Sequence, residues 1–193
     1  GEFLVIKNGH SGEISDFTID TTVNHDLSFI NMASGVSTTF NNVFIKGEFK
    51  YASSKQVLIN RNSDTSITIP DLLISESLLI SDDITLPSNL VVQSSGSLTA
   101  DSKTFTKESY AQGNITINTG SSSLQTITFN SCGLLKLVGL DSNATMSSLT
   151  LNNCTGMQIE GGSVDVSTVT INSATSDYLV SDDHTGTISG MTF

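Results

Sequence analysis

The chain has 193 residues and a formal net charge of −11, and its composition is unusual for a folded domain. Charged residues make up only 14%, tryptophan is absent, and serine, threonine and asparagine replace the common helix formers. Side chains of these types favour strands, so we predict an all-β protein. The acidic surface would repel phosphate backbones, which argues against nucleic acid as a partner, and no apolar run is long enough for a membrane-spanning helix.

The first half of the chain shows a weak repeat. Residues 1–3 (GEF) are expected to be a remnant of a cloning vector, which leaves residues 4–193 as one segment of a longer protein. An apolar residue followed by a polar turn former recurs at nearly even spacing, at Ile19-Asp20, Phe40-Asn41, Ile59-Asn60 and Ile80-Ser81. This spacing predicts coils of about 21 residues.

Residues 100–112 (ADSKTFTKESYAQ) are the least strand-like part of the chain. We expect them to form a protruding loop or a short helix that lengthens one coil. Phe105, Lys107 and Tyr110 would then be exposed and are candidate contact residues, because aromatic faces stack on sugar rings and loops often carry binding sites. An excursion without a role is the alternative.

The second half carries the clearest repeat. The pattern apolar-Thr-apolar-Asn-small-small begins at Ile127, Leu149 and Val169, and its first three residues return at Met191-Thr192-Phe193. These starting positions are almost evenly spaced along the chain. A coil of three short strands and three turns needs about this much chain, and stacking the coils about 4.8 Å apart joins their apolar faces into one core. The sequence therefore predicts a solenoid of about nine coils.

Corner residues extend this prediction to a known group of folds. Asn130, Asn152 and Asn172 each follow an apolar-Thr-apolar strand, and stacked asparagines can hydrogen-bond along a rod. This ladder resembles that of the right-handed parallel β-helix superfamily, which includes pectate lyases, phage tailspikes and passenger domains of bacterial autotransporters and adhesins. The resemblance implies a right-handed parallel β-helix. A β-sandwich is the alternative, although it gives no reason for a repeat of this length.

Two cysteines occupy the same place in neighbouring repeats, at Cys132 and Cys154. In a solenoid they stack within the range of a disulfide bond. The alternative, which we favour, is a stack of buried thiols above the equivalent Ala174, with each cysteine acting as a small apolar residue.

Two segments with paired aspartates echo each other, around Asp82-Asp83 and Asp182-Asp183. Paired carboxylates can bind calcium or act as acid and base in glycoside cleavage. A capped turn is the favoured interpretation, because aspartate side chains bond the local backbone after a strand. The acid and base motifs of polygalacturonases and the basic residue of pectate lyases have no suitable match, so we predict no catalytic residues, no resident metal and no cofactor.

These patterns together predict a non-enzymatic binding or structural segment. We expect an adhesin or autotransporter-like passenger at the cell surface or outside the cell, recognising a glycan, a host surface or a second copy of itself. A phage tailspike segment that binds bacterial polysaccharide is the first alternative, and a polysaccharide lyase or hydrolase is the second. The Thr-x-Thr elements also raise ice binding, but their flanking residues vary.

Overall fold

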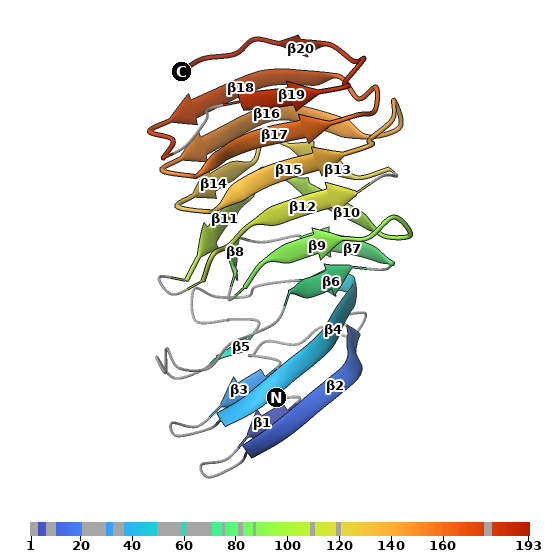
Figure 1. Ribbon diagram of the computed structural model, residues 1–193, viewed down its shortest axis with the longest axis vertical. Coiled ribbons are helices and arrows are strands. Elements are labelled where there is room, and N and C mark those ends of the chain that lie inside the picture. The colour runs from blue at the N-terminus through green and yellow to red at the C-terminus, as the bar shows by residue number, and fades with distance from the viewer. Residues whose placement is uncertain are drawn as a thin grey trace.

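The computed structural model describes residues 4–6, 11–20, 30–32, 37–49, 59–60, 71–74, 76–80, 83–86, 88–108, 111–118, 121–175 and 179–193. Within these ranges the chain forms strands and turns and no helix. The strands stack in chain order along one rod, with the N-terminal strands at one end and the C-terminal strands at the other (Figure 1). Neighbouring strands of successive coils pair in parallel. The predicted all-β parallel solenoid is confirmed.

Three rows of strands run along most of the rod. Row 1 contains β2 (Ser11–Asp20), β4 (Ser37–Phe49), β6 (Leu72–Ile74), β9 (Leu90–Val92), β12 (Ile115–Asn118), β15 (Leu134–Val138), β17 (Gly156–Glu160) and β19 (Leu179–Asp182). Row 2 contains β7 (Ser77–Ile80), β10 (Ser97–Asp101), β13 (Ser123–Gln125), the first parts of β16 (Thr145–Asn152) and β18 (Val166–Asn172), and β20 (Ile188–Ser189). Row 3 contains β8 (Ile84–Leu86), β11 (Thr104–Lys107), β14 (Thr128–Asn130) and the second parts of β16 and β18.

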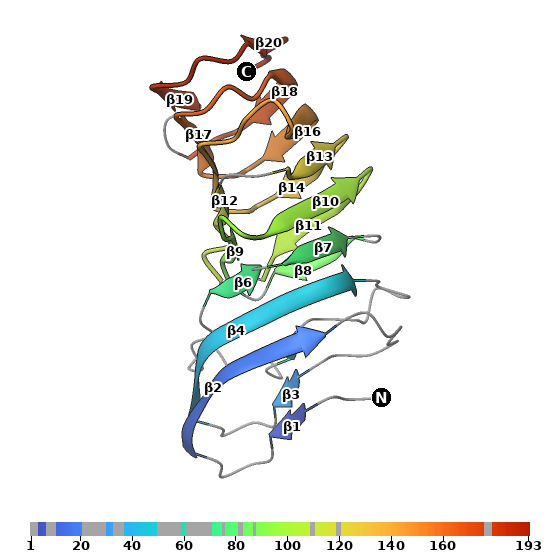
Figure 2. The ribbon, with the colours of Figure 1, turned by 90° about the vertical axis from the view of Figure 1, so that its right-hand side faces the viewer.

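A separate short sheet lies at the N-terminal end. It joins β1 (Leu4–Ile6), β3 (Ile30–Met32) and β5 (Ile59–Asn60), again in parallel. β1 and β3 precede the long strands β2 and β4 along the chain, so this end of the rod also winds in successive layers (Figure 2).

The core is a set of apolar columns that follow from the alternation of each strand. From β6 to β17 every second side chain of row 1 is buried, and one column runs through Leu72, Leu90, Ile115, Leu135 and Met157. All five are at most 2% exposed. Burying one such side chain contributes about 1.5–3 kcal/mol, so the stacked columns stabilise coils that could not fold alone.

The rod has fewer coils than predicted. The row 1 column from Leu72 to Leu179 advances in five steps, which makes about five coils in the continuously stacked part. The prediction of about nine coils is too high, because the N-terminal layers use more chain. Leu4 pairs with Ile30 and Ile30 with Ile59, and each of these separations is longer than any step between Leu72 and Leu179.

The predicted register is confirmed in the second half and wrong in the first. Leu149 pairs with Val169, and the equivalent threonines pair through to Thr192. In the first half, however, Ile19 pairs with Ile45 rather than with Phe40. A single apolar-polar dipeptide recurs easily by chance, whereas the longer pattern of the second half defines both the face and the corner of a strand.

The predicted loop at residues 100–112 is also wrong for most of its length. Ala100 and Asp101 end β10, residues 104–107 form β11, and Phe105 is fully buried between Ile84 and Phe129. The sequence does not predict β11 because the strand has only one inward aromatic side chain. Its outward residues are polar, and so is the corner at Asp101–Lys103 that precedes it. Residues 109 and 110 lie outside the described part of the chain.

Corners with left-handed backbone separate row 2 from row 3. At this corner, five successive coils each have a residue with a positive φ of 53° to 65°, at Ser102, Thr126, Ser148, Thr168 and Gly190. The N–H of Thr126 still donates to the carbonyl of Ser147 in the next coil, at 3.0 Å. The chain therefore turns at each corner without losing its hydrogen bond to the neighbouring coil.

Candidate functional site

The three predicted corner asparagines form a continuous ladder. Asn152 Nδ2 donates to Asn130 Oδ1, and Asn172 Nδ2 donates to Asn152 Oδ1, both at 2.9 Å. Backbone pairing of β14, β16 and β18 places these residues one above another. The bonds between the amides fix the orientation of each side chain at the surface of row 3.

A column of threonines runs beside this ladder. Backbone pairing aligns five of them, one in each of five coils: Thr104, Thr128, Thr150, Thr170 and Thr192. The same pairing continues the asparagine column through Thr106 to Thr85. We call the two columns the ladder face. Its side chains repeat about 4.8 Å apart along the rod and about 6.6 Å apart along a strand.

The ladder face is uncharged and accessible. Its ten positions carry only hydroxyl and amide groups, and each is half-buried or exposed. Hydroxyl groups both donate and accept hydrogen bonds, so the face offers both functions at a regular spacing.

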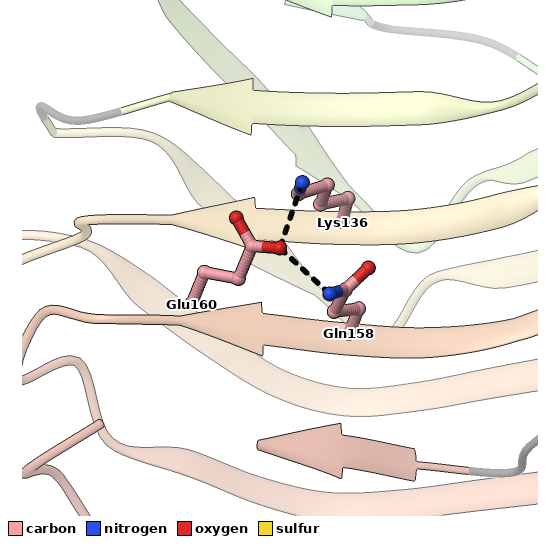
Figure 3. Close-up of polar contacts among 3 residues, drawn as sticks. All are labelled: Lys136, Gln158 and Glu160. Carbon is pink, nitrogen blue, oxygen red and sulfur yellow. Dashed lines mark hydrogen bonds and ion pairs between the residues drawn. The ribbon is translucent and has the colours of Figure 1, made fainter. Parts of the chain in front are cut away.

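A cluster of charged side chains lies on row 1. Lys136 Nζ lies 2.8 Å from Glu160 Oε1, and Gln158 Nε2 donates to the same oxygen at 2.6 Å (Figure 3). Exposed Asp182 pairs with Glu160 in the next coil. About a third of each charged side chain of the ion pair is exposed, so solvent screens it and it contributes at most about 1 kcal/mol. Row 1 therefore differs chemically from the ladder face.

A second polar ladder, which the repeat pattern does not predict, lies at the start of the row 1 strands β6, β9, β12 and β15. Asn89 Nδ2 donates to Asp71 Oδ1 at 2.9 Å, and Asn89 Oδ1 accepts from the N–H of Asn114 at 3.0 Å. Asn114 Oδ1 in turn accepts from the N–H of Leu134 at 2.9 Å. The signal was present, because each of these side chains directly precedes an apolar-x-apolar strand. Side-chain oxygens here serve as acceptors for backbone N–H groups of the next coil.

The two aspartate pairs do not come together. Asp83 Oδ1 accepts from the N–H of Thr104 in the next coil at 2.8 Å, so it bonds a neighbouring coil rather than the backbone of its own turn. Asp182 and Asp183 lie at the end of β19 in row 1, several coils away, and Asp82 lies outside the described residues. Across the described ranges, no group of three or more His, Cys, Asp or Glu side chains could hold a metal ion.

The two cysteines are stacked, buried and in the thiol form. Cys132 Sγ lies 3.4 Å from the carbonyl oxygen of Phe105, and Cys154 Sγ lies 3.3 Å from that of Phe129. Interaction with the neighbouring Cys154 thiol and burial raise the pKa of Cys132 far above its usual range, whereas interaction with Cys132 lowers the pKa of Cys154.

The three predicted contact residues do not form an exposed site. Phe105 belongs to the core, where its ring centroid lies 5.4 Å from that of Phe129. Lys107 is half-buried, and its Nζ donates to the carbonyl oxygen of Glu108 at 3.4 Å. Tyr110 lies outside the described residues.

Comparison with known proteins gives no relative. No protein-family model, no curated protein and no solved structure matches the chain. In the part of the chain that the structure describes, no helix is both long and apolar enough to cross a bilayer.

Proposed function

We propose that the chain is a non-enzymatic segment of an adhesin-like rod, displayed at the cell surface or secreted, and that its ladder face binds a neutral glycan. One observation carries the proposal: the hydroxyl and amide groups of the ladder face are held in register over five coils. A glycan chain presents hydroxyl groups at regular intervals and can bond to several coils at once.

Rigidity supports this choice of face. The amides of Asn130, Asn152 and Asn172 are already tied to one another, so binding costs them little side-chain entropy. The neighbouring threonines have stiff χ1 angles, which adds to the preorganisation of the surface.

Charge supports a neutral ligand. The chain carries a formal net charge of −11, so an acidic polysaccharide approaching the rod would be repelled. The ladder face has no charged side chain to strip of water, and the charged cluster of Lys136 and Glu160 lies on row 1. A neutral glycan on the ladder face is not repelled by the net charge, and its binding does not remove water from a charged side chain.

A glycan array of neutral and acidic polysaccharides tests the proposal. The variant Thr128→Val, Thr150→Val and Thr170→Val removes three hydroxyls but keeps the shape and strand propensity of the column. Each hydrogen bond contributes about 0.5–1.5 kcal/mol and about 1.4 kcal/mol is tenfold in affinity, so we expect neutral-glycan binding to weaken about tenfold or more.

The matched control removes three hydroxyls from a column of row 2, across the corner. Pairing stacks Ser147, Ser167 and Ser189, and their replacement by alanine is expected to leave affinity unchanged. Equal losses in both variants, or binding to acidic glycans alone, would contradict the proposal. A stable trimer in sedimentation would favour a tailspike. Cleavage of the bound glycan that is lost in Asp182→Ala and Asp183→Ala would show an enzyme.

A further inference from the structure

We propose that Cys132 and Cys154 are an oxidation site: hydrogen peroxide converts the two thiols to a disulfide that joins neighbouring coils. The inference is independent of the ladder face, because it concerns the interior of the rod. It assigns a chemical role to two side chains that the proposed glycan binding does not use.

Backbone register brings the two cysteines together. Asn130 pairs with Asn152, and each cysteine lies two positions further along its coil. Just beyond, the N–H of Thr155 donates to the carbonyl of Gly133 at 3.2 Å, so the pairing continues past the cysteines. Stacked positions lie about 4.8 Å apart, which is inside the Cα separation of about 4.4–6.8 Å found for disulfides.

The side chains also face the same space. Both cysteines are buried, with exposed fractions of 5% for Cys132 and 1% for Cys154. Each Sγ lies near the carbonyl oxygen of an aromatic residue in the preceding coil, Cys132 near Phe105 and Cys154 near Phe129. The two sulfurs therefore occupy equivalent places in neighbouring coils.

The contact distinguishes the two sulfurs. Interaction with Cys132 lowers the pKa of Cys154, whereas interaction with Cys154 and burial raise that of Cys132, so the Cys154 sulfur is the one that loses a proton first. A thiolate is the form that attacks peroxide, and a neighbouring thiol can resolve the product. Cys154 is thus the attacking residue and Cys132 the resolving residue.

The reaction balances in two steps. The Cys154 thiolate attacks one peroxide oxygen, the O–O bond breaks, and the products are a sulfenic acid on Cys154 and hydroxide, which takes up the proton that the thiol released. The Cys132 sulfur then attacks the sulfenic sulfur, an S–S bond forms, and the second oxygen leaves as water. The two thiols lose two protons and two electrons, and one hydrogen peroxide becomes two waters.

Burial and spacing set the character of the bond. Because both sulfurs are buried, we expect a small oxidant such as peroxide to react and a large disulfide reagent to react much more slowly. The coil spacing already suits the Cα separation of a disulfide, so we expect the bond to form with little movement of the two coils. Dithiothreitol, added after denaturation, is expected to reduce the bond and restore both thiols.

The test uses the folded protein, treated with hydrogen peroxide and then alkylated after denaturation. We expect a mass lower by two hydrogen atoms, a cross-linked peptide pair containing Cys132 and Cys154, and full recovery of both thiols after dithiothreitol. Alkylation of both thiols after peroxide treatment, or cross-links only between molecules, would overturn the proposal. This measurement needs no variant, so it does not depend on the folding of a mutant.

Two variants test the assigned order of the sulfurs. Serine has nearly the size of cysteine and keeps a hydrogen-bond donor beside the remaining sulfur, so Cys132→Ser and Cys154→Ser preserve the interaction that distinguishes the two thiols. With dimedone as the trap for sulfenic acid, Cys132→Ser should be labelled at Cys154 about tenfold faster than Cys154→Ser is labelled at Cys132. Equal or reversed rates would overturn the assignment of Cys154 as the attacking residue.

Discussion

The N-terminal layers and the C-terminal coils both stack parallel strands, but they use different lengths of chain per layer. In the N-terminal region β2 and β4 are 10 and 13 residues long, and Ser11 at the start of one pairs with Ser37 at the start of the other. In the C-terminal region each coil uses less chain, since Leu135 pairs with Met157 and Met157 with Leu179. Figure 2 shows the long N-terminal strands as curved ribbons below the shorter strands of the upper coils.

The long strand β4 makes the difference clear. Its middle pairs with β6 of row 1 and its end pairs with β7 of row 2, so one strand serves both rows. In a later coil the same path is divided between β9 and β10, with a turn at residues 94–95. Both regions pair in parallel with their neighbouring coils, so they do not differ in the kind of pairing. They differ in whether a turn divides the strand between rows 1 and 2, and this turn makes the later coils regular.

The largest expected effect comes from the core of the regular region. Phe129 is 1% exposed and its ring contacts that of Phe105, so Phe129→Ala should lower the free energy of unfolding by about 3–5 kcal/mol. Ile14 in β2 is only partly buried against the same core, and Ile14→Ala should cost about 1–2 kcal/mol. Urea unfolding followed by circular dichroism measures both. Equal losses would show that the two regions are equally well packed.

The sequence predicted the fold where it repeats a long pattern. The segment around Leu149-Thr150-Leu151-Asn152 specifies an inward pair, an outward hydroxyl and a corner, and its register is confirmed. The prediction that Phe105 is exposed is wrong because β11 is short and the neighbours of Phe105 are polar. A single apolar residue does not produce the alternating pattern by which a strand is recognised. The ladder of Asp71, Asn89 and Asn114 was missed because its unequal steps along the chain break a fixed period.

The site was less predictable than the fold for a physical reason. The asparagine ladder could be anticipated because identical residues recur at one spacing, but the ladder face also needs the register of β11 and β14, which the sequence left unassigned. Which surface carries charge depends on how the three rows divide each coil. Residues with positive φ, such as Thr126 and Thr168, make that division. Threonine rarely adopts a left-handed backbone conformation, so the residue type does not predict a corner at these positions.

A second prediction concerns the close stacking of corners in the regular region. Gly161 and Gly162 both have positive φ, at 61° and 77°, but only Gly162 lies against the backbone of Leu140. A Cβ on Gly162 would overlap the Leu140 carbonyl oxygen, whereas one on Gly161 meets no atom within 4 Å. We expect Gly162→Ala to lower the unfolding free energy by about 3 kcal/mol and Gly161→Ala by about 1 kcal/mol.

Thermal and urea unfolding of the two glycine variants separate steric overlap from backbone strain. Strain is common to both positions, so the difference between the variants reports the overlap alone. Similar losses would mean that the corner moves away from Leu140 at little cost. In that case close stacking would not explain the regularity of the C-terminal coils.

The smallest expected effect tests whether the asparagine ladder keeps the corners in place. Asn152 takes part in two bonds between amides and Asn172 in one, so Asn152→Ala should cost about 1–3 kcal/mol and Asn172→Ala about 0.5–1.5 kcal/mol. The N–H groups of Ser131 and Asn153 donate to the carbonyls of Asn152 and Asn172, both at 2.8 Å. If the ladder orders the corner, hydrogen exchange at these two N–H groups should be faster in Asn152→Ala than in Asn172→Ala, even under conditions where both variants remain folded. Unchanged exchange together with lower global stability would mean that the ladder adds to stability without determining the corner, and the regularity of the C-terminal coils would then rest on their apolar columns.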